Sequence, residues 1–239
     1  MPNGRATRVR PARVARAVRR RLSRKPVAHF LHLPKTGGTA IRAALVGQEL
    51  SGSYRLHLAY HGLTFDEVPR GEKVFFAVRD PASRFVSGFY SRQRKGQPRY
   101  LVEWTEAEAA VFERFSTPND LAEALSDPRR ETADAARAAM SAVRHFHLQS
   151  HWVRPAAAVE RSDDILAALS QSRLDADFAA LCAVLQVSAS LPHDDVAAHR
   201  NPAAVDRRLS DRATANLRDW YAEDYELLDV LARRTRGAR

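Results

Sequence analysis

Apolar residues in the first half of the chain form short continuous runs, each followed by a turn and then by helical spacing. One run covers residues 27–33 and ends at Pro34, and a second covers residues 74–78. Runs without polar alternation are typical of strands buried on both faces of a parallel sheet. Apolar positions at helical spacing follow over 40–45 and 81–90. The pattern predicts two strand–turn–helix units, with Asp80 capping the second helix ahead of Pro81.

The second half of the chain is predicted to be largely helical. Helices are expected over 104–115, 119–125, 131–147, 174–187 and 210–234, and an irregular loop over 188–209. The pattern alone also assigns helix to residues 164–169. Strands that alternate with helices indicate an α/β layered fold with a central, mainly parallel sheet and a helix-rich C-terminal half.

The charge of the chain is concentrated at its N-terminus. The 239 residues carry a net charge of +10, yet residues 1–25 contain ten Lys and Arg and no acid, which leaves 28 basic and 28 acidic residues afterwards. We expect residues 1–25 to be a basic, flexible tail and residues 26–239 to form a single domain. Charge runs of this kind are commonly solvated extensions, so no specific nucleic-acid partner is predicted. Contact of residues 1–25 with anionic membranes, which would weaken with salt, stays open.

Several classes of protein are disfavoured by what the sequence lacks. Cys182 is the single cysteine, which excludes an internal disulfide framework. No apolar run approaches the ~18 residues of a membrane span, and the N-terminus lacks the apolar core of a signal peptide, so a soluble, cytoplasmic protein is expected. His147 and His151 have the spacing of zinc ligands but no clear third ligand, so no metal site is predicted.

The turn after the first strand has the chemistry of an anion site. Its residues are Lys35, Thr36, Gly37, Gly38 and Thr39. Glycines let the backbone approach an anion closely, and the amides and dipole of the following helix favour a phosphate. The lysine adds a positive charge and the threonines add hydroxyl donors. The lysine precedes the glycines, whereas it follows them in the phosphate loop of ATP and GTP hydrolases. The alternative interpretation is a simple tight turn.

The end of the second strand carries a further candidate anion site. Arg79 leaves the strand, and Ser87 lies two turns along the next helix. An arginine and a serine so placed can hold a second phosphate together. Arg84 is expected either to join them or to pair with Asp80 at the surface.

These two segments together resemble a known family. Residues 32–39 are similar to the 5′-phosphosulfate loop of sulfotransferases, and residues 78–81 with Arg84, Ser87, Phe89 and Tyr90 are similar to their 3′-phosphate motif. The order and spacing resemble the carbohydrate sulfotransferases that include the heparan and chondroitin enzymes, and the likeness extends more weakly over 27–232. It implies a P-loop-like three-layer fold with a late strand near 164–169. Where family members often have an arginine and a glutamate, residues 169–172 read Leu-Ser-Gln-Ser.

The resemblance implies a reaction. A sulfuryl group would pass from 3′-phosphoadenosine-5′-phosphosulfate to a hydroxyl of a carbohydrate or glycolipid, without a metal. Lys35 would neutralise the charge on the leaving oxygen. The amides from Thr36 to Thr39 would hold the 5′-phosphate, and Arg79 with Ser87 the 3′-phosphate.

A hydroxyl acceptor benefits from a general base, most often a histidine. His57 and His61 lie in residues 55–62, which we expect to be a loop beside the strand ends that bind the donor. His61 matches the family's histidine ahead of the second strand and is the first candidate, and His57 is the second. His29 and His32 are expected to be packed in the first strand, and residues 199–201 to reach the nucleotide or substrate.

Other functions stay open at this point. The chain could be a small-molecule kinase with a degenerate phosphate loop, a catalytically inactive anion-binding relative, or a binding module driven by residues 1–25. The acceptor and the oligomeric state are not indicated by the sequence.

Overall fold

The computed structural model describes residues 25–98, 100–192 and 205–237. Within them, four parallel strands form one sheet in the order β2–β1–β3–β4. The strands are β1 (Val27–Leu31), β2 (Arg55–Leu58), β3 (Lys73–Val78) and β4 (Ile165–Ser170). Because all four are parallel, their carboxyl ends meet at one edge of the sheet, which is where ligands bind in open α/β folds.

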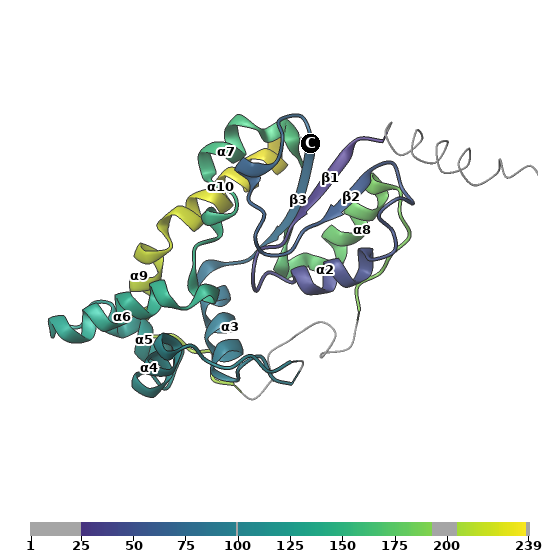
Figure 1. Cartoon of the computed structure of the whole chain (residues 1–239). Helices are drawn as coiled ribbons and strands as arrows, with labels where there is room; N and C mark the ends of the chain where they lie inside the picture. Colours follow the sequence, from purple (N-terminus) through teal and green to yellow (C-terminus); the bar gives the residue numbers. More distant parts are fainter. Residues whose placement is uncertain (1–24, 99, 193–204, 238–239) are drawn as a thin grey trace, which may run out of the picture.

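Helices cover both faces of the sheet (Figure 1). On one face α2 (Gly38–Leu45) and α8 (Leu174–Leu185) pack on Phe30 and Phe75. On the other face α7 (Pro155–Glu160) and α10 (Ala222–Gly237) pack on Leu31 and Phe76. Both faces are therefore buried, which accounts for the continuous apolar runs of β1 and β3. The expected three-layer α/β fold is confirmed.

A second group of helices packs around its own apolar core, beyond the carboxyl ends of the strands (Figure 1). Phe85, Phe89 and Phe146 lie at its centre. The helices are α3 (Pro81–Gln93), α4 (Glu106–Arg114), α5 (Pro118–Ala124), α6 (Arg130–Ala142) and α9 (Asp211–Trp220). This group forms the helix-rich part of the chain and faces the edge of the sheet where a ligand is expected.

Both predicted strand–turn–helix units are present. Asp80 caps α3, since its Oδ1 accepts a hydrogen bond from the Ser83 amide at 2.7 Å. β4 is the late strand that the family resemblance implied, and the helix assigned there from the pattern alone is wrong. Its sequence from Ile165 to Ser170 has helix-favouring alanines and leucines, but pairing with β3 overrides that local preference.

Three other expectations are corrected. Residues 55–58, expected in a loop, form the edge strand β2. The helix predicted over 131–147 ends at Ala142 and is followed by two 3₁₀ turns, η2 (Arg144–Phe146) and η3 (Gln149–His151). The helix predicted over 210–234 is two helices, α9 and α10, that meet at Tyr221. Tyr221 is fully buried and its hydroxyl donates to the carbonyl of Phe146 at 2.7 Å.

Several predictions concern segments outside the described residues. The tail predicted over 1–25 is described only at Lys25, whose ammonium donates to the carbonyls of Leu50 and Gly52. Residues 199–201, expected near a ligand, also lie outside them. Among the helices of the described segments, none combines the length and the apolar character needed to cross a membrane.

Candidate anion-binding site

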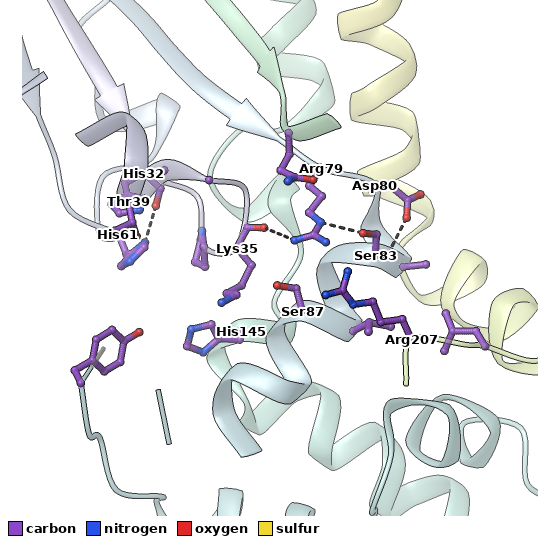
Figure 2. Close-up of a pocket in the computed structure, with 18 residues that line it drawn as sticks. His32, Lys35, Thr39, His61, Arg79, Asp80, Ser83, Ser87, His145 and Arg207 are labelled. Carbon is purple, nitrogen blue, oxygen red and sulfur yellow. Dashed lines mark hydrogen bonds between the residues drawn. The ribbon is translucent and has the colours of Figure 1, made fainter. Parts of the chain in front are cut away.

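A cavity of about 510 Å³ opens at the carboxyl ends of β1 and β3 (Figure 2). Its volume lies within the range of roughly 300–1,000 Å³ that is usual for small-molecule sites. Its wall combines the loop after β1, the start of α3, residues from η2 and the segment before α9. The lining includes Lys35, Gly37, Gly38, Thr39, His61, Arg79, Ser87, Tyr100, His145, Gln171 and Arg207.

The loop after β1 has the backbone of an anion cradle. Lys35 and Gly37 adopt positive φ values of 66° and 93°. Gly37 precedes α2 and provides no side-chain cap, while the first amides of a helix have no intrahelical acceptor. A Cβ on Gly38 would lie 2.3 Å from Cδ2 of His32, so the second glycine makes room for that ring. The loop therefore presents backbone donors to the cavity.

The two threonines of the loop face different environments. The Thr36 side chain is fully buried and its hydroxyl donates to the carbonyl of Leu33 at 3.0 Å. The expectation that this hydroxyl serves a ligand is therefore wrong, and only the amide of Thr36 can take that role. Thr39 lines the cavity as expected.

Among the residues that the structure describes, no carboxylate forms an ion pair with the ammonium of Lys35. Figure 2 places its ammonium end between His145 and Ser87. Burial lowers the pKa of Lys35 to about 7, and the charges of Arg94 and Arg79 add to that effect. A bound anion would supply the missing counter-charge and raise this pKa again.

Arg79 and Ser87 face the same cavity, as the sequence predicted. The Arg79 side chain is held by Nε, which donates to Ser83 Oγ at 2.9 Å, and by Nη1, which is 3.4 Å from the carbonyl of Lys35. Burial, followed by the nearby charge of Arg207, lowers the pKa of Arg79 to about 10. Arg79 and Arg207 thus form a second basic end of the cavity, opposite His61.

Arg84 does not line the cavity, and it does not form the surface ion pair with Asp80. It is fully buried and lies 3.8 Å from Asp224 of α10, which is equally buried, and it does not pair with Asp80. Its guanidinium also donates to the backbone carbonyls of His145 and His147 and lies 5.7 Å from the ring centre of Tyr221. Arg84 therefore holds the helices together behind the cavity.

His61 is oriented as a general base requires. Its Nδ1 lies 2.7 Å from the carbonyl oxygen of His32. A carbonyl only accepts, so the neutral imidazole has its proton on Nδ1 and its lone pair on Nε2. Burial lowers the pKa of His61, which keeps the ring neutral at pH 7. Its ring packs on that of His32 with centroids 3.9 Å apart.

His57, the second candidate, lies elsewhere. It is exposed in β2, and its Nδ1 is 2.9 Å from Nδ1 of His29, whose Nε2 is 2.5 Å from Glu72. It does not line the cavity. His57 was expected in a loop beside the donor. It lies instead in β2, and the pairing of β2 with β1 places it opposite His29.

The lining residues that were missed from the sequence include Tyr100, His145, Gln171 and Arg207. His145 was assigned to a helix that in fact ends before it, and Arg207 to an irregular loop. Gln171 stands where the resembled family often has a charged residue, which was the one available signal. Among the described residues, no group of three His, Cys, Asp or Glu side chains is placed to hold a metal ion.

The cavity as a whole suits a multiply charged anion. Lys35, Arg79 and Arg207 line it, while the one lining carboxylate among the described residues is Asp80, which caps α3. Comparisons of the chain with protein-family models, with curated proteins and with solved structures found no match.

Proposed function

We propose that the protein is a sulfotransferase that uses 3′-phosphoadenosine-5′-phosphosulfate and sulfates a hydroxyl of a carbohydrate or glycolipid. The observation that carries the proposal is the sharing of one cavity by two anion-binding elements from neighbouring parallel strands. Lys35 follows β1, Arg79 follows β3, and a histidine with a fixed lone pair lies at the far end. The order of these motifs along the chain is the one that resembles the family.

The donor would lie across the strand ends. Its 5′-phosphate would accept hydrogen bonds from the loop amides, and its 3′-phosphate would meet Arg79, Ser87 and Arg207. An arginine matches two phosphate oxygens at once, which suits the fixed 3′-phosphate end of the nucleotide. The sulfuryl group, attached to the 5′-phosphate, then falls next to Lys35.

The proposed transfer is an in-line displacement at sulfur. The acceptor oxygen forms a bond to sulfur while the bond from sulfur to the bridging oxygen of the 5′-phosphate breaks. The acceptor proton passes to Nε2 of His61, and the electron pair of the broken bond stays on the phosphate, next to the Lys35 ammonium. The products are a sulfate ester and adenosine 3′,5′-bisphosphate, with the proton on His61 released to water.

The acceptor class rests on the family resemblance. A hydroxyl must approach the sulfur from the side of His61, opposite the nucleotide. Tyr100 also lines the cavity and is 43% exposed. Aromatic rings of this kind present an apolar face and a polar tip to a partly hydrated ligand. Contact of residues 1–25 with anionic membranes remains a separate proposal.

The test is transfer from sulfur-labelled donor to a panel of glycan and glycolipid acceptors, with Lys35→Ala as the matched inactive control. Binding of adenosine 3′,5′-bisphosphate is measured in parallel with that of ATP and magnesium. Labelled ester from the wild type and none from the variant is the expected result. Preference for ATP with phosphoryl transfer would instead make the protein a kinase. Tight bisphosphate binding without any transfer across the panel would indicate an inactive anion-binding relative.

A further inference from the structure

His145 lines the cavity, and the proposed sulfuryl transfer has so far given it no role. We propose that His145 is a second catalytic histidine, whose ring N–H donates a hydrogen bond to the transferred sulfuryl group beside Lys35. This inference rests on the proposed function and adds a residue that neither motif contains.

The position of the ring carries the argument. His145 and His61 line the cavity from different elements, η2 and the loop after β2. Figure 2 shows the His145 ring next to the ammonium end of Lys35. Lys35 marks the place where the bond to sulfur breaks, so a donor beside it faces the oxygens of the sulfuryl group.

The backbone of His145 is fixed against α3. A Cβ on Gly88 would lie 3.0 Å from the His145 carbonyl oxygen and 3.2 Å from its Cβ, so the glycine allows η2 to approach closely. Arg84 donates to that same carbonyl at 3.4 Å and also to the carbonyl of His147. Two contacts from one buried side chain hold this turn in place, as a preorganised site requires.

The charges around His145 define which form of the ring is present. Burial and then the charge of Lys35 hold the pKa of His145 well below its ordinary value, with further contributions from Arg92, His61 and Arg84. A neutral imidazole offers one N–H donor and one acceptor. The sulfuryl oxygens only accept, so they take the donor. The lone pair of His61 is already oriented by His32, and the base role therefore stays with His61.

The experiment compares His145→Ala and His145→Gln with the wild type. Removal of one donor to a developing negative charge costs about 10²–10³-fold in turnover, and His145→Gln should recover part of this because it keeps an N–H group. Affinity for adenosine 3′,5′-bisphosphate should stay unchanged, since this nucleotide lacks the sulfuryl group. The acidic limb of the pH–rate profile should remain, because it belongs to His61.

Three outcomes overturn the inference. Wild-type turnover in His145→Ala would show that the hydrogen bond to the sulfuryl group does not exist. A parallel loss of bisphosphate affinity means that His145 only supports the nucleotide loop. Disappearance of the acidic limb means that His145 is the base.

A measurement on the wild type removes any dependence on how the variants fold. In ¹⁵N-histidine NMR spectra, the His145 ring signals should shift more when the sulfated donor is added than when the bisphosphate is added, because only the donor offers a hydrogen-bond acceptor to the ring. A wild-type protein that binds neither nucleotide refutes the proposed function and this inference together. A protein that transfers sulfate while its His145 signals do not respond refutes this inference alone.

Discussion

The side-chain amide of Gln149 hydrogen-bonds both backbone groups of Arg79. The Arg79 amide donates to Oε1 of Gln149 at 2.9 Å, and Nε2 of Gln149 donates to the Arg79 carbonyl at 2.9 Å. Nε2 also lies 3.4 Å from a carboxylate oxygen of Asp224. The end of β3 is thus held by an amide that is itself anchored to α10, and this fixes where the Arg79 guanidinium can reach.

The first prediction follows from this contact. Gln149→Leu should weaken binding of adenosine 3′,5′-bisphosphate by roughly tenfold, because two partly buried backbone groups of Arg79 lose their partner and the Arg79 side chain shifts. Binding of adenosine 5′-phosphate should change little, since it uses the loop after β1. Calorimetry with both nucleotides measures the difference. Equal losses for the two nucleotides would indicate general damage and contradict the positioning role.

The second prediction separates the two cations of the site. Arg79→Ala should lower bisphosphate affinity by roughly 10- to 100-fold, the worth of a hydrogen bond to a charged group. Lys35→Ala should lower bisphosphate affinity as well, and it should in addition lower turnover at saturating donor, because Lys35 acts on the bond that breaks. Single-turnover kinetics and calorimetry on both variants distinguish these effects. Wild-type bisphosphate affinity in Arg79→Ala would refute its assignment to the 3′-phosphate.

The sequence predicted the part of the site that is local in the chain. Lys35, Gly37 and Gly38 follow a strand and open a helix, and this short-range pattern determines the shape of the loop. Arg79 and Ser87 belong to the second unit of the same kind. Parallel pairing of β1 and β3 then brings the two units side by side, which is why both reach one cavity.

What the sequence could not predict depends on contacts between distant segments. Arg84 is buried because α10 delivers Asp224 to it, and a pair 140 residues apart leaves no local pattern. His145 reaches the cavity because α6 ends early and Gly88 admits the following turn. Residues 165–170 are a strand because β3 is there to pair with them. In each case a tertiary contact decides between local alternatives.

The third prediction concerns the buried pair of Arg84 and Asp224. Asp224→Asn should destabilise the protein by about 3–5 kcal/mol, because it leaves the Arg84 guanidinium buried without a counter-charge. Urea unfolding measures the change. The matched control is Asp66→Asn, which removes an exposed partner 2.7 Å from Arg154 and should cost no more than about 1 kcal/mol. A small loss for Asp224→Asn, similar to that of the control, would show that Arg84 does not need this carboxylate.

The fourth prediction concerns the general base. His61→Ala should lower turnover by roughly 10²–10⁴-fold and leave bisphosphate affinity nearly unchanged, because its Nε2 faces the acceptor side. His57→Ala is the control within the same segment and should keep wild-type turnover, since its ring contacts His29 outside the cavity. Turnover is measured at saturating donor and acceptor. Near-wild-type turnover of His61→Ala would remove its catalytic role.

The last prediction is a pH dependence that comes from Lys35. Its pKa of about 7 in the free protein means that the ammonium loses its proton as the pH rises through neutrality. An anionic ligand binds the protonated form better, so bisphosphate affinity should fall above pH 7 by up to about tenfold per pH unit.

The phosphates are fully ionised over that range and contribute no trend of their own. Calorimetry between pH 7 and 8.5, well below the pKa of about 10 of Arg79, should detect proton uptake on binding in buffers of different ionisation enthalpy. Lys35→Arg keeps its charge and should give a flat profile. A flat profile in the wild type as well would mean that Lys35 is fully protonated before the ligand arrives, and that its burial does not control donor binding.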